Sequence, residues 1–322
     1  MGTNVLVVGC GELGRRHIQG IVKSVNKPVV YVIDNDPKAI ALLKSFLVNN
    51  LERSRYPAIK VIDFLKKDLV SLPVFDLVIV ATTALARGEL LGNLSPFIRT
   101  KHWLIEKPIG QSSAEIKSIA KWASDRSAFV NHPRRMMSWY QSISNNFIDT
   151  GPIKLTALYP KFGIACNTSH LIDLINWWTE AIPASVSVDG LNENWNRSKR
   201  KGFWDIEGLL KIKFSDGSAI ELQSNKEVKK SVLEIEFAGT KRCIIEEDLG
   251  IARFSSGEVI MGNMQYQSEI SGMLLDQLYE TGKCDLPSLN IMAVCNELFV
   301  ERLLQHWNSR TNGKKLYSLP ST

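Results

Sequence analysis

Residues 5–17 read Val-Leu-Val-Val-Gly-Cys-Gly-Glu-Leu-Gly-Arg-Arg-His: an apolar strand leads directly into the pattern G-x-G-x-x-G and then into helix-forming sequence. In a dinucleotide-binding fold, Gly9 permits the tight turn, Gly11 lets the backbone approach a pyrophosphate, and Gly14 lets the helix lie close to the strand. The free N–H groups at the start of the helix attract the phosphates. The stretch predicts a dinucleotide site whose loop includes Glu12 and Leu13.

Asp34 completes this pattern. A second apolar stretch, residues 29–33, ends on Asp34, which follows Gly9 by 25 residues. An acidic side chain there accepts hydrogen bonds from the adenosine ribose and repels a 2′-phosphate, which favours NAD over NADP. The strand before, the helix after and the trailing acid favour a cofactor site over a glycine-rich turn that binds nothing.

Length and composition are those of a globular protein with about two domains. The chain has 322 residues, of which 44% are hydrophobic and 22% are charged. No apolar run approaches the roughly 18 residues of a membrane span, and the chain enters its first strand too early for a signal peptide. Five scattered cysteines without Cys-x-x-Cys spacing favour reduced thiols and no metal site. We therefore expect a cytoplasmic protein that does not bind membranes.

The net charge of +6 is unevenly distributed, with basic runs at Arg134-Arg135 and at residues 197–201. Solvated loop charge is the usual explanation of such runs. They are short and lack a recognisable nucleic-acid-binding module, so we expect no nucleic-acid partner. The alternative is a small anionic molecule, whose carboxylate or phosphate Arg134, Arg135 and Arg200 can bind through paired hydrogen bonds.

The first 129 residues alternate strands with helices, as a doubly wound parallel sheet requires. Further strands are predicted at residues 76–81 and 103–105, and an exit strand begins at residue 129. Helices are predicted at residues 38–48 and 113–124, the second behind a capping box of Ser112 and Glu115. We expect residues 1–129 to form an NAD-binding Rossmann domain in an α/β protein.

From residue 150 the pattern changes to short alternating strands separated by Gly, Asp and Asn turns, which is typical of a largely antiparallel sheet. We expect residues 130–322 to form an α+β domain for substrate binding and oligomerisation, with an open sheet. The active site is expected in the cleft between the domains. The expected strands are 153–159, 186–191, 206–214, 219–223, 233–238 and 243–246, followed by helices at 264–281 and 290–307.

Lys107 is the first candidate catalytic residue. It lies in Glu106-Lys107-Pro108, after a strand of the first domain, and ligands bind at the carboxyl ends of such strands. Pro108 restricts the residue before it to extended backbone, which fixes the direction of the lysine. Lys107 can hold a substrate hydroxyl or share its proton; a surface lysine before a turn is the alternative.

His170 and Asp173 are the second candidate pair, three residues apart on one face of a helix predicted to run to about residue 179. Asn167, Thr168 or Ser169 is expected to cap this helix. His170 would then lie in the first turn, where the positive helix end disfavours an imidazolium. A neutral imidazole suits a general base; a histidine satisfied within the core is the alternative.

In this order, the glycine pattern, Glu106-Lys107-Pro108 and His170-x-x-Asp173 resemble the glucose–fructose oxidoreductase / inositol dehydrogenase / MocA (Gfo/Idh/MocA) family over nearly the whole chain. The resemblance implies a nicotinamide cofactor, a cis Lys107–Pro108 peptide, and a sugar or cyclitol hydroxyl held by Lys107 and His170. It places Thr82, Thr83, Glu106 and Lys107 near the cofactor. We expect a homodimer or homotetramer that forms through the C-terminal sheet.

The sequence departs from the family pattern at two positions. Cys166 stands where the family has an aspartate four residues before the histidine, and Arg87 where it has a histidine after a Thr-Pro pair. Residues 130–135, 163–167 and 198–200 resemble a subgroup found beside acidic-sugar (nonulosonate) and surface-polysaccharide pathways. The candidate substrate-binding residues are Asn131, Arg134, Arg135, Asn167 and Arg200.

These features predict an NAD-dependent oxidoreductase that transfers a hydride between nicotinamide and a hydroxyl carbon of a sugar, nucleotide sugar or sugar acid. His170 takes the hydroxyl proton with the help of Lys107, and Asp173 orients one of the two. Two alternatives stay open. One is a redox-neutral, glycosidase-like enzyme of the same family that uses NAD transiently. The other is a non-catalytic NAD-binding sensor or assembly protein, which the departure at Cys166 supports.

Overall fold

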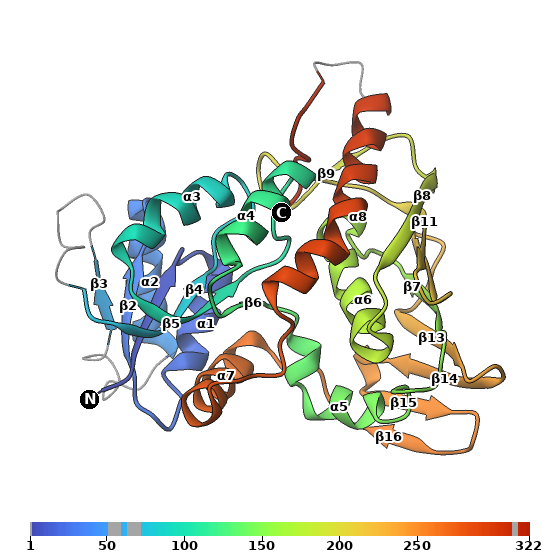
Figure 1. The fold of residues 1–322 in the computed structure, drawn as a ribbon, viewed down its shortest axis with the longest axis horizontal. Helices are drawn as coiled ribbons and strands as arrows, with labels where there is room; N and C mark the ends of the chain where they lie inside the picture. The colour runs from blue at the N-terminus through green and yellow to red at the C-terminus, as the bar shows by residue number, and fades with distance from the viewer. Residues whose placement is uncertain (1, 51–58, 63–71, 311–314) are drawn as a thin grey trace. The chain divides into compact units, whose positions relative to one another are not determined.

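The computed structural model describes residues 2–50, 59–62, 72–310 and 315–322, which form two compact units (Figure 1). Unit 1 consists of Met1–Glu106, Ile119–Met136 and Gln265–Asn290. Unit 2 consists of Lys107–Ser118, Met137–Met264 and Ile291–Thr322. Each unit is thus assembled from segments that are not contiguous in sequence. The division of function between residues 1–129 and 130–322 stays a prediction.

A parallel sheet forms the centre of unit 1, and its described strands follow the order β3-β2-β1-β4-β5-β6. This is the order of a doubly wound dinucleotide-binding sheet, so the predicted N-terminal fold is confirmed. Strands β1 and β4 are almost entirely buried, which explains why they read as continuous apolar runs. The strands are β1 (Asn4–Val8), β2 (Val29–Ile33), β3 (Ile59–Val61), β4 (Phe75–Val80), β5 (Thr100–Ile105) and β6 (Ala128–Val130).

The helices of unit 1 include one from the far end of the chain, α7, which packs against α1. The two backbones approach closely at glycines: a Cβ at Gly272 would lie 2.7 Å from the carbonyl oxygen of Gly20. The predicted helix at residues 264–281 is confirmed. The helices are α1 (Glu12–Ile21), α2 (Pro37–Asn50), α3 (Arg87–Leu94) and α7 (Gln267–Thr281), with the short 3-10 helices η3 (Ser95–Phe97) and η4 (Pro133–Met136).

Unit 2 is built on a second sheet, whose described strands follow the order β16-β15-β14-β13-β7-β12-β11-β8. All neighbours in it are antiparallel except β7 and β12, which confirms the predicted largely antiparallel sheet. A separate hairpin of β9 and β10 precedes β11. The strands are β7 (Lys154–Tyr159), β8 (Pro183–Leu191), β9 (Asn196–Arg197), β10 (Trp204–Asp205), β11 (Gly208–Phe214), β12 (Ala219–Ser224), β13 (Val232–Phe237), β14 (Lys241–Glu246), β15 (Ile251–Phe254) and β16 (Val259–Met261).

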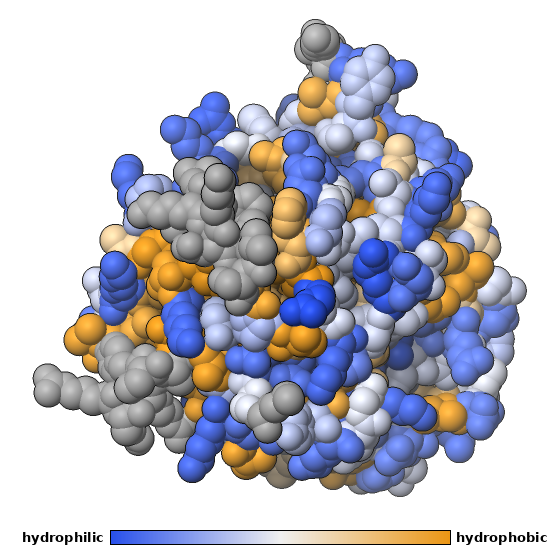
Figure 2. Space-filling model, turned by 60° about the vertical axis from the view of Figure 1, so that its left-hand side comes forward, coloured by the Kyte–Doolittle hydropathy of each residue, from blue (hydrophilic) through white to orange (hydrophobic). Residues whose placement is uncertain are grey.

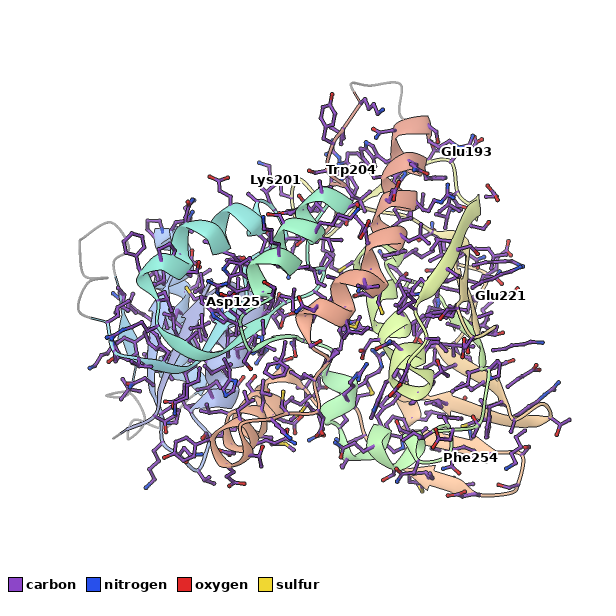
Figure 3. All side chains as sticks on the ribbon, in the orientation of Figure 1. Asp125, Glu193, Lys201, Trp204, Glu221 and Phe254 are labelled. Atoms are coloured by element: carbon purple, nitrogen blue, oxygen red, sulfur yellow. The ribbon has the colours of Figure 1, made fainter. Side chains whose placement is uncertain are left out.

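Helices α6 and α8 lie along one face of this sheet (Figure 1). Residues on β12 and β13 alternate between buried and exposed, so that Ile220, Leu222 and Ile235 enter the core. Glu221, labelled in Figure 3, lies on the opposite face and binds Lys211 at 2.8 Å. The helices are α5 (Ser138–Ser144), α6 (Ile164–Thr179), α8 (Leu289–Arg310) and η5 (Glu247–Leu249); α4 (Ser113–Ala123) is divided between the units.

No helix in the described part of the chain is both long and apolar enough to cross a membrane. On the face drawn in Figure 2, hydrophobic residues are interspersed with hydrophilic ones.

Candidate functional site

The glycine loop between β1 and α1 has the geometry that a bound pyrophosphate requires. Gly9 has a φ of +90°, and a Cβ at Gly14 would lie only 1.9 Å from the carbonyl oxygen of Gly9. A Cβ at Gly11, in contrast, would meet nothing within 4 Å. Helix α1 begins at Glu12 without a side-chain cap. The residues therefore fit a dinucleotide: the turn needs its glycines, and the open side of Gly11 leads to the helix N-terminus.

Asp34 lies at the end of β2, beside this loop. Its Oδ2 accepts the backbone N–H of Cys10 at 2.7 Å, and its Oδ1 accepts that of Asp36 at 2.9 Å. The carboxylate is therefore oriented before any ligand binds. Burial and the neighbouring Asp34 raise the pKa of the Cys10 thiol to about 12, so this cysteine stays protonated and unreactive at neutral pH.

Thr82 and Thr83 follow β4, and Thr82 borders the glycine loop: a Cβ at Gly9 would lie 3.0 Å from its Cγ2. The hydroxyl of Thr82 is buried and has no hydrogen-bond partner among the described residues, which fits a polar ligand at this point. Arg87 is completely buried and donates to the carbonyl oxygens of Thr82, at 2.7 Å, and of Glu106. The arginine thus ties the loop after β4 to the end of β5.

Glu106 belongs to a buried hydrogen-bond network of unit 1. Its Oε1 accepts a hydrogen bond from Asn131 at 2.5 Å and lies 2.8 Å from Nε2 of His17. His17 Nδ1 lies 3.0 Å from the hydroxyl of Ser271 on α7, and Asn131 also donates to Gln267 at 2.8 Å. Sequence reasoning missed His17. A polar side chain three residues after Gly14, on the helix face that covers the sheet, was the available signal.

Lys107 begins unit 2, and its peptide bond to Pro108 is cis, as the family resemblance implies. The ammonium donates to Oδ1 of Asn167 at 2.8 Å and to Sγ and the carbonyl oxygen of Cys166 at 3.3 and 3.4 Å. The lysine is half-buried. It is therefore held by the first turn of α6 and does not extend freely into solvent.

The start of α6 differs from the prediction. The helix begins at Ile164 behind Gly163, so Asn167, Thr168 and Ser169 lie inside it and the predicted cap is wrong. The carboxylate of Asp205, on β10, instead accepts the N–H of Ala165 at 2.8 Å. His170 consequently lies in the second turn of α6, so the predicted first-turn position is wrong. The field of the helix end decays within one turn and is weak at His170.

His170 and Asp173 lie on α6, one and two turns beyond the residues that bind Lys107. Asn167, His170 and Asp173 are spaced by three, so they share a helix face. His170 is half-buried, and Asp173 is buried. Unit 2 thus brings Lys107 to the same helix as both predicted partners, and their roles stay predictions.

The predicted anion-binding arginines are divided between the units. Arg134 and Arg135 lie in η4 of unit 1 and are partly exposed. Arg200 is exposed in the β9–β10 hairpin of unit 2, where the guanidinium carbon of Arg197 lies 5.6 Å from the centroid of the Trp204 ring. No group of three or more His, Cys, Asp or Glu side chains suited to a metal ion occurs among the described residues.

Residues 3–132 match the model of an oxidoreductase family described as an NAD-binding Rossmann fold. No curated protein matches the chain in sequence. Several solved structures share its fold over nearly its whole length.

The UDP-N-acetylglucosamine 3-dehydrogenase of Acidithiobacillus ferrooxidans is 14% identical and has a TM-score of 0.66, over 94% of this chain and 97% of that one. An Agrobacterium radiobacter oxidoreductase solved with NAD+, L-tartaric acid and magnesium is 13% identical, with a TM-score of 0.67 over 94% and 96%. A Sinorhizobium meliloti protein named as a myo-inositol dehydrogenase is 15% identical, with a TM-score of 0.65 over 94% and 96%. Residues 3–132 thus match the NAD-binding Rossmann domain of the Gfo/Idh/MocA oxidoreductase family, and the solved structures show the same fold over nearly the whole chain.

Proposed function

We propose that this protein is an NAD-dependent oxidoreductase that acts on a CH–OH group of a sugar, nucleotide sugar or sugar acid. One observation carries the proposal: the Lys107 ammonium binds Asn167 in the first turn of α6. His170 and Asp173 lie on the face of this helix that bears Asn167. Lys107 directly follows Glu106, the residue after β5 and the last of the first segment of the NAD-binding unit. The helix that carries the candidate proton-transfer group, His170, therefore also binds the Lys107 cation, and alcohol oxidation uses both kinds of group.

Two side chains, His170 and Lys107, act on the substrate hydroxyl. His170 accepts the hydroxyl proton as the carbon loses its hydride, and the Lys107 ammonium stabilises the alkoxide that develops. Asn167 holds that ammonium in place through its 2.8 Å hydrogen bond. The buried Asp173 orients His170. Bound NAD supplies the hydride acceptor, and the reverse direction uses the same groups.

We further propose an anionic substrate, bound through Arg134, Arg135 and Arg200 together with Asn131 and Asn167. Two relatives support this choice by name: one acts on a UDP-sugar and the other was solved with L-tartaric acid. Arginine suits both phosphate and carboxylate because it forms paired hydrogen bonds with either group. The setting that we propose is a cytoplasmic homodimer or homotetramer in nonulosonate or surface-polysaccharide biosynthesis.

The test is turnover by Lys107→Met and His170→Ala. UDP-N-acetylglucosamine, myo-inositol and L-tartrate are each offered with NAD+, and NADH formation is followed by absorbance. Each variant should lower turnover on the accepted substrate by about a hundredfold or more, which is the scale of losing a positioned proton-transfer group. Calorimetric NADH affinity should hardly change.

Lys229→Met, at an exposed lysine of unit 2, is the matched control and should keep full turnover. Near-normal turnover in both active-site variants would contradict the mechanism. NAD that stays bound while a glycoside is cleaved without net NADH would favour the redox-neutral enzyme instead. NADH binding with no turnover on a broad sugar panel would favour a sensor.

A further inference from the structure

A carboxylate that the sequence did not single out faces the turn of α6 that binds Lys107. Asp205 lies at the end of β10, and its Oδ1 accepts the backbone N–H groups of Ala165 and Ile206, both at 2.8 Å. Lys107 binds Cys166 and Asn167, the two residues that follow Ala165. The carboxylate and the ammonium therefore hold consecutive residues of one helical turn.

Gly163 leaves space for the carboxylate of Asp205 and the amide of Asn167. A Cβ at this position would lie 2.8 Å from Oδ2 of Asp205 and 3.3 Å from Nδ2 of Asn167. Gly163 also has a φ of +74°, which other residues rarely adopt. Asn167 donates from Nδ2 to the carbonyl oxygen of Phe162 at 2.5 Å, so its Oδ1 is directed to Lys107.

The hairpin that carries Asp205 is anchored within unit 2. The N–H of Trp204 donates to the carbonyl oxygen of Pro320 at 2.7 Å, and the Trp204 ring lies 5.7 Å from that of Trp307 on α8. Figure 3 labels Trp204 at this point. These contacts fix Trp204, the residue before Asp205, and so limit the movement of Asp205 relative to unit 2.

The pKa of the Asp205 carboxyl depends on its burial, on its hydrogen bonds and on the charge of Lys107. Burial raises the pKa of the Asp205 carboxyl, while the N–H groups of Ala165 and Ile206 and the positive charge of Lys107 act in the opposite direction. A carboxylate in such a partly desolvated place attracts a nearby ammonium more strongly than it would in water.

We propose that Asp205 is a positioning residue for Lys107: it fixes the first turn of α6 and stabilises the ammonium that this turn holds. The inference rests on the proposed function of Lys107. A purely structural helix cap is the competing explanation. The two differ in whether the negative charge matters, since an amide can also accept an N–H hydrogen bond.

The experiment compares Asp205→Asn with Asp205→Ala. The asparagine keeps an oxygen for the N–H groups but loses the charge, whereas alanine loses both. The first readout is the rate at which acetic anhydride acetylates Lys107 at pH 8, measured by peptide mass spectrometry relative to Lys229. Only the neutral amine reacts. Loss of a stabilising carboxylate should therefore accelerate the reaction about two- to fivefold in Asp205→Asn, the range of a modest ion pair.

The melting temperature should be unchanged in Asp205→Asn and lowered in Asp205→Ala. Asp216→Asn is the matched control, because Asp216 accepts the N–H and the hydroxyl of Ser218, both at 2.8 Å, in a turn of the same unit. That variant should leave the acetylation rate of Lys107 unchanged. An unchanged rate in Asp205→Asn as well would overturn the inference and leave Asp205 a helix cap.

The second readout is turnover on the substrate that the panel identifies. Asp205→Asn should lower kcat about tenfold with little change in the affinity for NADH. Faster acetylation combined with unchanged turnover would overturn the catalytic role proposed for Lys107. An unchanged acetylation rate would overturn the role of Asp205, whatever the turnover. The two failures are therefore distinguishable.

Discussion

The carboxylate of Asp34 is oriented by two backbone N–H groups, one from the glycine loop and one from Asp36. Each of its oxygens uses one lone pair in this way and keeps capacity for a ribose hydroxyl. A 2′-phosphate at this position would be repelled by the carboxylate, which its two hydrogen bonds keep from rotating away. The structure therefore adds a physical reason to the preference for NAD that the sequence pattern predicts.

NADH should bind substantially tighter than NADPH, and Asp34→Ser should narrow that difference by removing the repulsion. Calorimetric titration of both cofactors measures the two affinities. Asp125→Ser, which removes an exposed carboxylate of the same unit, is the control and should preserve the preference. Equal or inverted affinities in the unmutated protein would refute the assignment.

At position 166, the cysteine side chain accepts a hydrogen bond from Lys107 at 3.3 Å, where the family has an aspartate. The carboxylate in contact with this turn comes from Asp205. Asp205 therefore binds the same helical turn in which Cys166 replaces the aspartate of the family. This carboxylate supports an enzyme over a non-catalytic NAD-binding protein as the proposed function.

Among the elements, α1 and α7 show how close packing links distant parts of the chain. Gly20 and Gly272 allow their backbones to approach, and His17 on α1 meets Ser271 on α7 through a 3.0 Å contact. The buried network around Glu106 therefore depends on a helix encoded more than half the chain away. Any side chain at Gly272 must push the two helices apart.

Gly272→Val should destabilise the protein by about 1–3 kcal/mol, because its Cβ would lie 2.7 Å from the carbonyl oxygen of Gly20. Thermal melting followed by circular dichroism measures the effect. Gly92→Ala on α3 is the control: a Cβ there meets nothing within 4 Å, and alanine should stabilise the helix by about 0.5–1 kcal/mol. Equal melting temperatures for Gly272→Val and the unmutated protein would argue against the close helix contact.

At the scale of the whole molecule, substitution of basic residues in both units tests whether the substrate is anionic. Arg135→Gln and Arg200→Gln should each raise the Michaelis constant about tenfold to a hundredfold, since a charged hydrogen bond contributes about 1.5–3 kcal/mol. Arg197→Gln and Lys199→Gln should hardly change the Michaelis constant. The guanidinium of Arg197 already lies over the ring of Trp204. NADH affinity and melting temperature should change little in all four variants. Small changes of the Michaelis constant in all four variants would indicate that the substrate is a neutral sugar.

Assembly through the eight-stranded sheet is a second whole-molecule prediction. Ile244 on β14 is 41% exposed among charged residues of the face opposite α6 and α8. Ile244→Glu should reduce the molar mass measured by light scattering to that of a smaller species, because the charge would be buried at the interface. Val25→Glu, at an exposed valine of unit 1, is the control and should leave the molar mass unchanged. A monomeric unmutated protein would disprove this assembly.

The sequence by itself determined the Rossmann sheet and its cofactor loop, because a tight turn, a close helix and an acidic residue leave a local pattern at fixed spacing. It also determined the antiparallel character of the second sheet, since alternation reports one buried face. Lys107, His170 and Asp173 were identifiable as candidates because their residue types and helical spacing suit proton transfer.

Only the tertiary structure decided which distant residues meet. It brought α7 to α1, buried Arg87 between Thr82 and Glu106, and put Asp205 at the start of α6, three residues before the first of the predicted caps. Local patterns extend over three or four residues, whereas these contacts join segments far apart in the chain. They depend on how whole elements pack, because a buried polar group takes whichever partner the fold brings within reach.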